Sequence, residues 1–250
     1  MEQVNLSMEN YEQFIRCLSI LKDICNDVDI HQGIIRQRTN DSANVFEIDM
    51  TPIITAIDLP IVLVKQKIDL LKVFLNQNSN QNQTIVITVE DSGSFTFSDE
   101  FSTLTFEGPE LDYMDNKFIP QTELETIFTL NEEDVILRTE IDPNISDRMR
   151  IIAQSFNVNS TQIIFAGEVA SVYMETQGKD QSAKILSNIV IEQPMNCTSS
   201  LVNTPFIIDH DGKIELKMYN YSEQICSNTF KTGISDIDIT IYGRSSLIDD

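Results

Sequence analysis

The sequence of 250 residues contains no tryptophan, only eight glycines and only 17 lysines and arginines. None of the patterns G-x-x-x-x-G-K-[ST], G-x-G-x-x-G or G-x-S-x-G occurs in it. No apolar run approaches the ~20 residues that a membrane-spanning helix needs. The sequence therefore indicates no nucleotide-binding loop, no serine-hydrolase site and no membrane span.

The four cysteines lack the spacing of a zinc site, because no C-x-x-C pair exists among them. They are Cys17, Cys25, Cys197 and Cys226. The first residues lack the basic and apolar regions of a secretory signal. We therefore expect a reduced cytoplasmic protein (in the host cytoplasm if viral) that binds no metal and no cofactor.

Two histidines and one acidic run are the only candidates for catalytic or metal chemistry. His31 lies in a strand-like stretch without a nearby serine or cysteine nucleophile, which favours an ordinary structural histidine. His210 lies between two aspartates but lacks the ligand series of a calcium loop, which favours a polar turn. Residues 132–134 are three adjacent acids, which are expected in a chain this acidic. No catalytic residue is predicted.

The formal net charge is −22, from 39 acidic and 17 basic residues. A protein that binds nucleic acid needs a basic footprint for the phosphates, so the total charge argues against such binding. The same charge is also consistent with simple solubility. The positions of the basic residues must decide between the two.

Isoleucine and valine dominate many apolar runs, and β-branched residues favour strands. Residues 7–26 have helical period with Ser7 as the N-cap, and residues 65–75 are predicted to form a second helix. Asp91-Ser92-Gly93-Ser94 predicts a hairpin turn. Further strands are expected at 29–38, 44–54, 84–90, 95–97 and 101–106.

An acidic stretch separates this half from the next. Residues 107–134 hold nine acids and one lysine, which predicts a solvated connector. After it, a strand at 135–141 precedes a helix at 146–157 with Ser146 as its cap, followed by strands and a proline-led, helix-like segment at 205–217 that leads into a strand at 217–221. The order of elements repeats, so we predict two similar lobes: residues 1–110 and 135–250, joined by a connector at 111–134.

Nine basic residues fall in or beside the four helix-like segments. They are Arg16, Lys22, Lys65, Lys67, Lys72, Arg148, Arg150, Lys213 and Lys217. Lys65 and Lys72 share one helix face, with Asp69 between them. The concentration fits a DNA-binding face, and it equally fits the preference of helices for lysine and arginine on solvated surfaces.

In this order of elements the chain resembles the two-domain DNA polymerase sliding clamps of tailed bacteriophages and of the PCNA type. The resemblance is carried by residues 11–24, 29–38, 45–50, 63–74, 146–152, 162–165 and 237–242. It implies an α+β fold of two clamp lobes, with curved antiparallel sheets outside and helices on the inner face. Three subunits would close into a ring, and the nine basic residues would face the DNA backbone.

Membership of that family would also imply partners: encircled, non-specific double-stranded DNA, a DNA polymerase and a clamp loader, bound by a homotrimer. Short peptides of these proteins would dock in an apolar pocket near the connector. The candidate contacts are Leu111, Tyr113, Met114, Phe118 and Ile119. The same residues could instead fasten the connector to the sheets.

Two other classes of function remain open at this point. An acidic, β-rich binding protein or virion structural protein without a role in replication would share this composition. An enzyme whose site is assembled from residues distant in sequence is the third. The sliding clamp is the hypothesis that accounts for both the repeated lobes and the placement of the basic residues.

Overall fold

The structure, a computed structural model, describes residues 1–22, 24–40, 44–54, 61–75, 83–108, 118–128, 130–156, 158–176, 182–202, 208, 210–222 and 224–249. The chain forms two compact units. The first comprises residues 1–120 and 234–239, and the second comprises residues 121–233 and 240–250. The division at residue 120 lies inside the acidic stretch 107–134.

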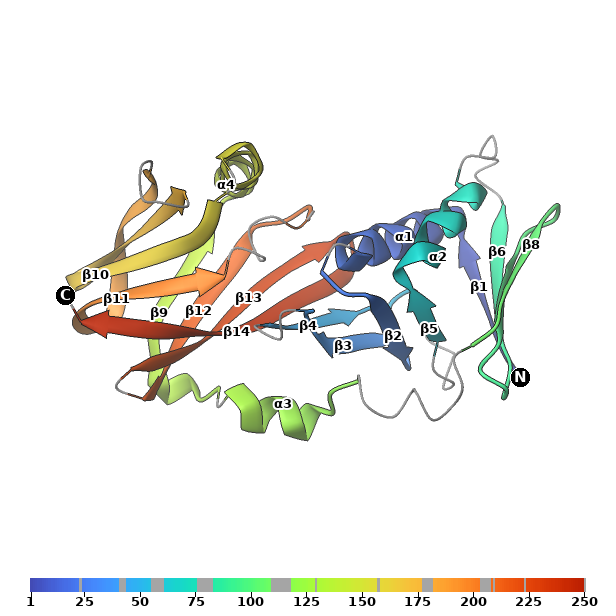
Figure 1. The fold of residues 1–250 in the computed structure, drawn as a ribbon, viewed down its shortest axis with the longest axis horizontal. Helices are drawn as coiled ribbons and strands as arrows, with labels where there is room; N and C mark the ends of the chain where they lie inside the picture. Colours follow the sequence, from blue (N-terminus) through green and yellow to red (C-terminus); the bar gives the residue numbers. More distant parts are fainter. Residues whose placement is uncertain are drawn as a thin grey trace. The chain divides into compact units, whose positions relative to one another are not determined.

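The first unit opens with a strand that the sequence analysis did not predict. Its elements are β1 (Glu2–Ser7), α1 (Met8–Lys22), β2 (Asp27–His31), β3 (Ile34–Arg38), β4 (Asn44–Asp49), β5 (Ile61–Val64), α2 (Lys65–Leu71), the 3-10 helix η1 (Lys72–Phe74), β6 (Thr84–Val89), β7 (Phe95–Ser98) and β8 (Thr103–Phe106) (Figure 1). The strands pair antiparallel in the orders β1-β6-β7-β8 and β5-β2-β3-β4. Helix α1 packs against α2.

Helix α1 forms where the sequence predicts it. Its apolar positions recur every three or four residues, and this face is buried. The hydroxyl of Ser7 accepts a hydrogen bond from the amide of Asn10 at 3.2 Å, which confirms Ser7 as the N-cap. The helix ends at Lys22, and its basic side chain is placed favourably at the negative end of the helix dipole.

The core of the first unit is an aromatic cluster around Tyr11. Its ring centroid lies 6.2 Å from that of Phe14, 6.0 Å from Phe74 and 6.4 Å from Phe97. The Tyr11 hydroxyl donates a hydrogen bond of 2.8 Å to the carbonyl of Leu71, the last residue of α2. Burial raises the pKa of Tyr11, so the hydroxyl stays a neutral donor. One buried bond thus satisfies a carbonyl at the end of α2 and joins the two helices.

The hairpin predicted at residues 91–94 is confirmed. It joins β6 to β7, with Val89 opposite Phe95. Gly93 has a φ of +82°, which a residue with a Cβ adopts at a cost, so glycine suits this turn. Phe95 and Phe97 alternate inward from the hairpin into the aromatic cluster.

After a short helix and a 3-10 helix, the second unit repeats the strand–helix–strand order with which the first unit begins. Its elements are α3 (Gln121–Phe128), the 3-10 helix η3 (Glu132–Asp134), β9 (Val135–Ile141), α4 (Pro143–Phe156), β10 (Val158–Thr176), β11 (Ser182–Val202), β12 (Ile214–Ser222), β13 (Ile225–Ile234) and β14 (Ile237–Asp249). Strand order is β9-β12-β13-β14, and β11 pairs with β14 and β10. Strand β9 pairs antiparallel with β12 as β1 pairs with β6. The predicted α+β class with antiparallel sheets is confirmed.

Helix α4 begins earlier than predicted, and the expected cap is wrong. Ser146 is buried inside the first turns, where its hydroxyl donates to the carbonyl of Pro143 at 2.9 Å. The residue before the helix, Asp142, accepts a hydrogen bond from the amide of Asn144 at 2.8 Å. Aspartate followed by proline at the first helical position is a strong helix start, because proline there loses no hydrogen bond.

The helix-like segment predicted at 205–217 is a further correction. Residues 214–222 form strand β12, and residues 203–207 and 209 lie outside the described part of the chain. Ile214, Leu216 and Met218 are buried and alternate with partly exposed residues. This period of two was already visible in the sequence and favours a strand over a helix.

Replacing Tyr11 with phenylalanine should destabilise the first unit. The Leu71 carbonyl would lose its donor in a buried setting, which costs about 1–2 kcal/mol. We expect the melting temperature measured by calorimetry to fall by roughly 2–6 °C. Tyr221→Phe is the matched control, because Tyr221 is exposed, and it should change little. Equal effects of the two substitutions would contradict this role for Tyr11.

Candidate functional site

Three charged side chains converge where α1 meets α2. The Lys22 ammonium, from the last residue of α1, forms an ion pair with one carboxylate oxygen of Asp69 on α2. The other oxygen of Asp69 lies 3.2 Å from the ammonium of Lys72. Hydrogen bonds from Lys22 and then from Lys72 hold the pKa of Asp69 below its usual value. The group carries a net charge of about +1 and remains accessible to solvent.

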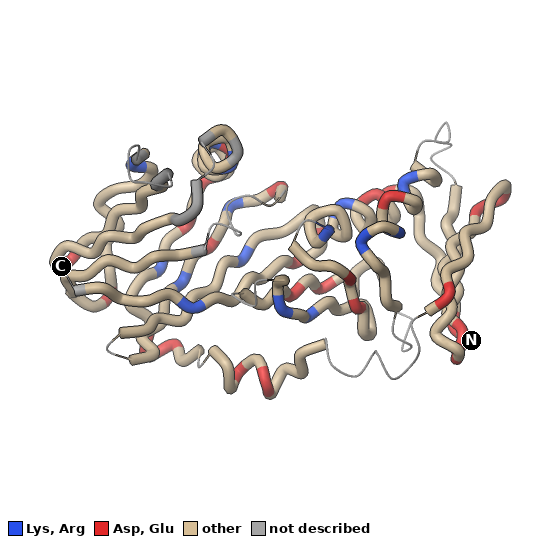
Figure 2. The backbone as a smooth tube through the Cα atoms, in the orientation of Figure 1, with Lys and Arg blue, Asp and Glu red and all other residues tan. Residues whose placement is uncertain are grey.

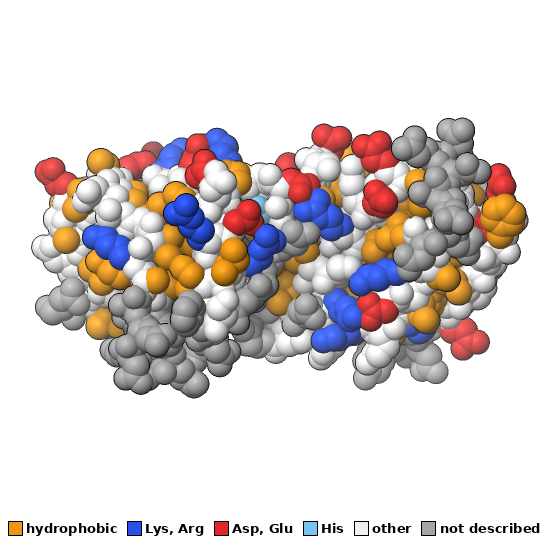
Figure 3. Space-filling view, turned by 90° about the horizontal axis from the view of Figure 1, so that it is seen from above, with side chains coloured by type: hydrophobic (Ala, Val, Ile, Leu, Met, Phe, Trp, Pro, Cys, Tyr) orange, Lys and Arg blue, Asp and Glu red, His pale blue; other side chains and the backbone are white. Residues whose placement is uncertain are grey.

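The other predicted basic residues of the first unit lie on the same two helices. Arg16 lies on α1, and Lys65 and Lys67 lie on α2. The Lys67 ammonium lies 5.5 Å from the centroid of the Phe106 ring and 3.4 Å from the carbonyl oxygen of Glu107. Lysine, arginine and acidic positions mix along α1 and α2 (Figure 2). Seen from the side on which these helices lie, the first unit, at the right of Figure 3, shows blue and red side chains interleaved.

In the second unit, helix α4 carries two of the predicted DNA-binding residues, Arg148 and Arg150. Arg150 forms an ion pair with Asp147, one turn earlier, at 2.7 Å. Arg148 is exposed. The neighbouring Ile151 is 60% exposed, so this surface is partly apolar as well as charged. On this helix, as on α2, an acid accompanies the bases.

Lys213 and Lys217 were expected in the helix-like segment 205–217, with a strand beginning at Lys217; the helix-like placement is wrong, and the strand is confirmed. Lys217 lies on β12, directly opposite Arg138 of β9, and Lys213 precedes the same strand. The Lys217 ammonium lies 3.1 Å from Glu132 and 3.7 Å from Glu215, and its side chain is only 15% exposed. Lys213 is paired with Glu140.

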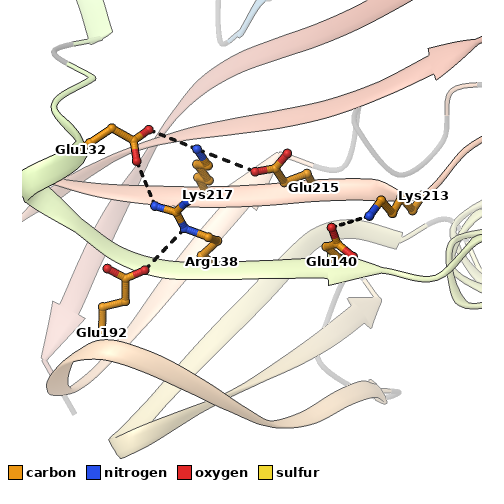
Figure 4. A network of polar contacts seen from close by, with 7 residues as sticks. All are labelled: Glu132, Arg138, Glu140, Glu192, Lys213, Glu215 and Lys217. Atoms are coloured by element: carbon orange, nitrogen blue, oxygen red, sulfur yellow. Dashed lines mark hydrogen bonds and ion pairs between the residues drawn. The ribbon is translucent and has the colours of Figure 1, made fainter.

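These two lysines belong to an ion-pair network on β9, β12 and the neighbouring segments (Figure 4). Its members are Glu132, Arg138, Glu140, Glu192, Lys213, Glu215 and Lys217. Arg138 contacts Glu132 at 2.9 Å and Glu192 at 3.5 Å. Hydrogen bonds from Lys217 and then from Arg138 lower the pKa of Glu132. Four carboxylates against three cations leave this surface slightly negative, which makes it a poor binding surface for phosphate.

The end of the connector is fastened to the sheet of the first unit. The Phe118 ring lies 4.5 Å from the ring of His31 and 5.5 Å from the guanidinium carbon of Arg36. The Ile119 amide donates to the Arg36 carbonyl at 2.8 Å, and Arg36 pairs with Glu47 at 2.5 Å. Phe118 and Ile119 therefore do fasten the chain to β3. The remaining candidates, Leu111, Tyr113 and Met114, lie outside the described residues.

Each histidine lies close to an oxygen atom of a neighbouring residue. The Nε2 atom of His31 lies 2.9 Å from a carboxylate oxygen of the buried Asp29. The Nδ1 atom of His210 lies 2.8 Å from the carbonyl oxygen of Gly212, as expected in a polar turn. Among the described residues, no group of three or more histidine, cysteine or acidic side chains could hold a metal ion. No helix in the same residues is long and apolar enough to cross a membrane.

Comparison with solved structures identifies the architecture. The chain matches A. fulgidus PCNA, solved with the C-terminal region of FEN-1 bound, with a TM-score of 0.62 and 11% identity over 100% of both chains. It matches the PCNA2-PCNA3 complex of Sulfolobus tokodaii with a TM-score of 0.61 and 11% identity over 97% of this chain and 98% of the other. The chain has a PCNA-like sliding-clamp fold. No family model and no curated protein matches the sequence.

The pairing of Lys22 with Asp69 is not visible in the sequence. The two residues are 47 positions apart, and only the packing of α1 on α2 brings them together. The sequence also does not single out Arg36, whose guanidinium and backbone hold the connector. Arg36 follows Ile34 and Ile35 in β3, and nothing in that short sequence distinguishes it from any polar strand residue.

Replacing Phe118 with alanine should loosen the end of the connector. The ring contacts with His31 and Arg36 contribute roughly 1–2 kcal/mol by aromatic and cation–π attraction. We expect the Ile119 amide to exchange its hydrogen about tenfold faster, measured by mass spectrometry. Phe101→Ala is the matched control, because that ring is 79% exposed and should leave Ile119 unaffected. Unchanged exchange in Phe118→Ala would refute the fastening.

Proposed function

We propose that this chain is a DNA sliding clamp, a non-enzymatic processivity factor that encircles duplex DNA and tethers a DNA polymerase. The observation that carries the proposal is the PCNA-like fold over the whole chain. Basic residues on α1, α2 and α4 support it, because these helices would supply phosphate contacts without reading sequence.

The net charge of −22 is compatible with this function. A closed ring stays on DNA because it is linked to it, so the contacts themselves can be weak and non-specific. Weak contacts also favour sliding, since each phosphate contact must break as the ring moves. Lys213 and Lys217, held in their network of acids, would contribute little, whereas the cations on the helices would contribute most.

Ring closure would come from strand edges of neighbouring copies. Strand β8 ends the order β1-β6-β7-β8, so its outer edge has unpaired backbone groups among the described strands. Such an edge pairs readily with another chain. Phe101, in the turn before β8, is 79% exposed and would add an apolar contact. A homotrimer of two-lobed subunits is the expected assembly.

The clamp would serve as a platform for a polymerase and a clamp loader in the cytoplasm. A. fulgidus PCNA was solved with the C-terminal region of FEN-1 bound, which supports peptide docking as the mode of recruitment. We place the docking site near the connector, at Leu111, Tyr113, Met114, Phe118 and Ile119. Because Ile119 is only 5% exposed and is bound to Arg36, its part would be to hold the connector in place beside a docked peptide.

The assembly can be measured directly. Size-exclusion chromatography with light scattering should give a mass near three times 28.4 kDa. Phe101→Asp should shift this trimer to monomer, because a buried unpaired carboxylate opposes the contact. Glu133→Asp, a conservative change at another exposed site, is the control. A monomeric wild type at micromolar concentration would favour the alternative of an acidic binding or virion protein.

The DNA-facing role of the helices predicts a functional defect. Lys65→Glu, Lys72→Glu and Arg150→Glu combined should impair loader-dependent, processive synthesis on primed circular DNA by about tenfold or more, because phosphate contacts become repulsive. The charge-matched control combines Lys184→Glu, Lys213→Glu and Lys231→Glu, which lie on or beside strands. Circular dichroism should confirm that both variants fold. Equal activity of the two variants would refute the assignment of the helices.

A further inference from the structure

Asp69 lies between the ammonium groups of Lys22 and Lys72, two of the cations that the proposed function assigns to DNA phosphates. It is the one acid on α2 and η1, which also carry Lys65, Lys67 and Lys72. Its two carboxylate oxygens each contact a different ammonium, those of Lys22 and Lys72. A phosphate oxygen pair would make the same two contacts with the same charge pattern. The carboxylate therefore satisfies the two lysines in the absence of DNA.

We propose that Asp69 is a built-in competitor for DNA phosphate, which weakens the hold of Lys22 and Lys72 on the DNA backbone. The inference rests on the proposed clamp function and concerns how that clamp controls its grip. A tethered carboxylate is always close to the two ammonium groups, so it displaces a phosphate quickly when the ring moves by one position. The affinity for DNA phosphates is then low enough for the ring to slide, while the remaining positive charge still attracts the DNA.

The competing explanation is that the two ion pairs of Asp69 only stabilise the fold. Their small contribution to the free energy of unfolding argues against it. The side chains of Asp69 and Lys72 are 49% and 42% exposed, and that of Lys22 is 27% exposed. Ion pairs at this exposure contribute little to stability. Helices α1 and α2 are already joined by the Tyr11–Leu71 hydrogen bond and by fully buried Ile68 and Leu71. Removing the charge of Asp69 should therefore leave the fold intact.

The charge of Asp69 makes the proposal measurable by salt dependence. Each phosphate contact made by a cation adds about 0.9 to the slope of log binding constant against log salt concentration. If Asp69→Asn frees both ammonium groups, the slope should steepen by about one to two. At ~50 mM salt, binding to a labelled linear duplex should become about tenfold tighter. Linear duplex is suitable because it tests the contacts without requiring ring closure.

Three variants isolate the cause. Asp69→Glu retains the charge and should bind duplex as the wild type does. Glu133→Gln removes one negative charge from an exposed position on η3 and should change the affinity less than twofold. In a Lys22→Gln, Lys72→Gln background, Asp69→Asn should have no effect, because nothing remains for the aspartate to occupy. Melting temperatures of Asp69→Asn and the wild type should agree within about 2 °C.

The outcomes separate this inference from the proposed function. Wild-type affinity and slope in Asp69→Asn, with processive synthesis intact, would overturn the inference and leave the clamp function standing. Tighter duplex binding by Asp69→Asn, with no loader-dependent processivity in the wild type, would support the competition and refute the clamp. An effect of Asp69→Asn that persists without Lys22 and Lys72 would overturn the inference, because it would reflect general charge alone.

Discussion

The buried contact between α1 and α2 is the interaction on which the candidate site depends. The Tyr11 hydroxyl and the aromatic cluster fix the two helices, and this fixed geometry brings Lys22 next to Asp69. The charged groups are themselves too exposed to set the geometry. Packing therefore provides the position and the surface charges provide the chemistry. A defect in packing would affect the electrostatics, whereas a change of surface charge would leave the packing intact.

Local patterns predicted the parts of the fold that local physics determines. The helix after Ser7 and the hairpin at Gly93 were found because periodicity, capping and turn chemistry act over a few residues. Strand β1 was missed because a short alternation in residues 2–7 gains its meaning only from pairing with β6. The helix-like segment was wrong from Ile214 on, where buried and partly exposed residues alternate with the period of a strand.

In the candidate site, too, the sequence predicts local placement but not contacts between distant residues. Sequence reasoning placed basic residues on α1, α2 and α4, but it could not determine which acids would meet them. Lys22 and Asp69 come from different helices, and Lys217 meets Glu132 across 85 positions of the chain. Such pairings depend on tertiary packing and strand register, which a single sequence does not reveal. They decide whether a lysine can hold a phosphate or is already occupied.

Screening by salt explains how a chain with a net charge of −22 could still bind DNA. At physiological salt the Debye length is about 8 Å, so a phosphate bound at α2 would sense the charges within that distance far more than the total charge of the chain. By the same reasoning, the acids of the network around Glu132 would act only on groups within about that distance.

The proposed clamp function also explains how the fold can match that of A. fulgidus PCNA at only 11% sequence identity. Buried alternation and helix packing require apolar residues of about the right size, which many sequences supply. A clamp that holds DNA by enclosure needs no base contacts, so few side chains at its DNA-facing surface are fixed by chemistry. Under this proposal such a ring must retain a weak positive face, and on α2 that weakness would be set by one carboxylate between two ammonium groups.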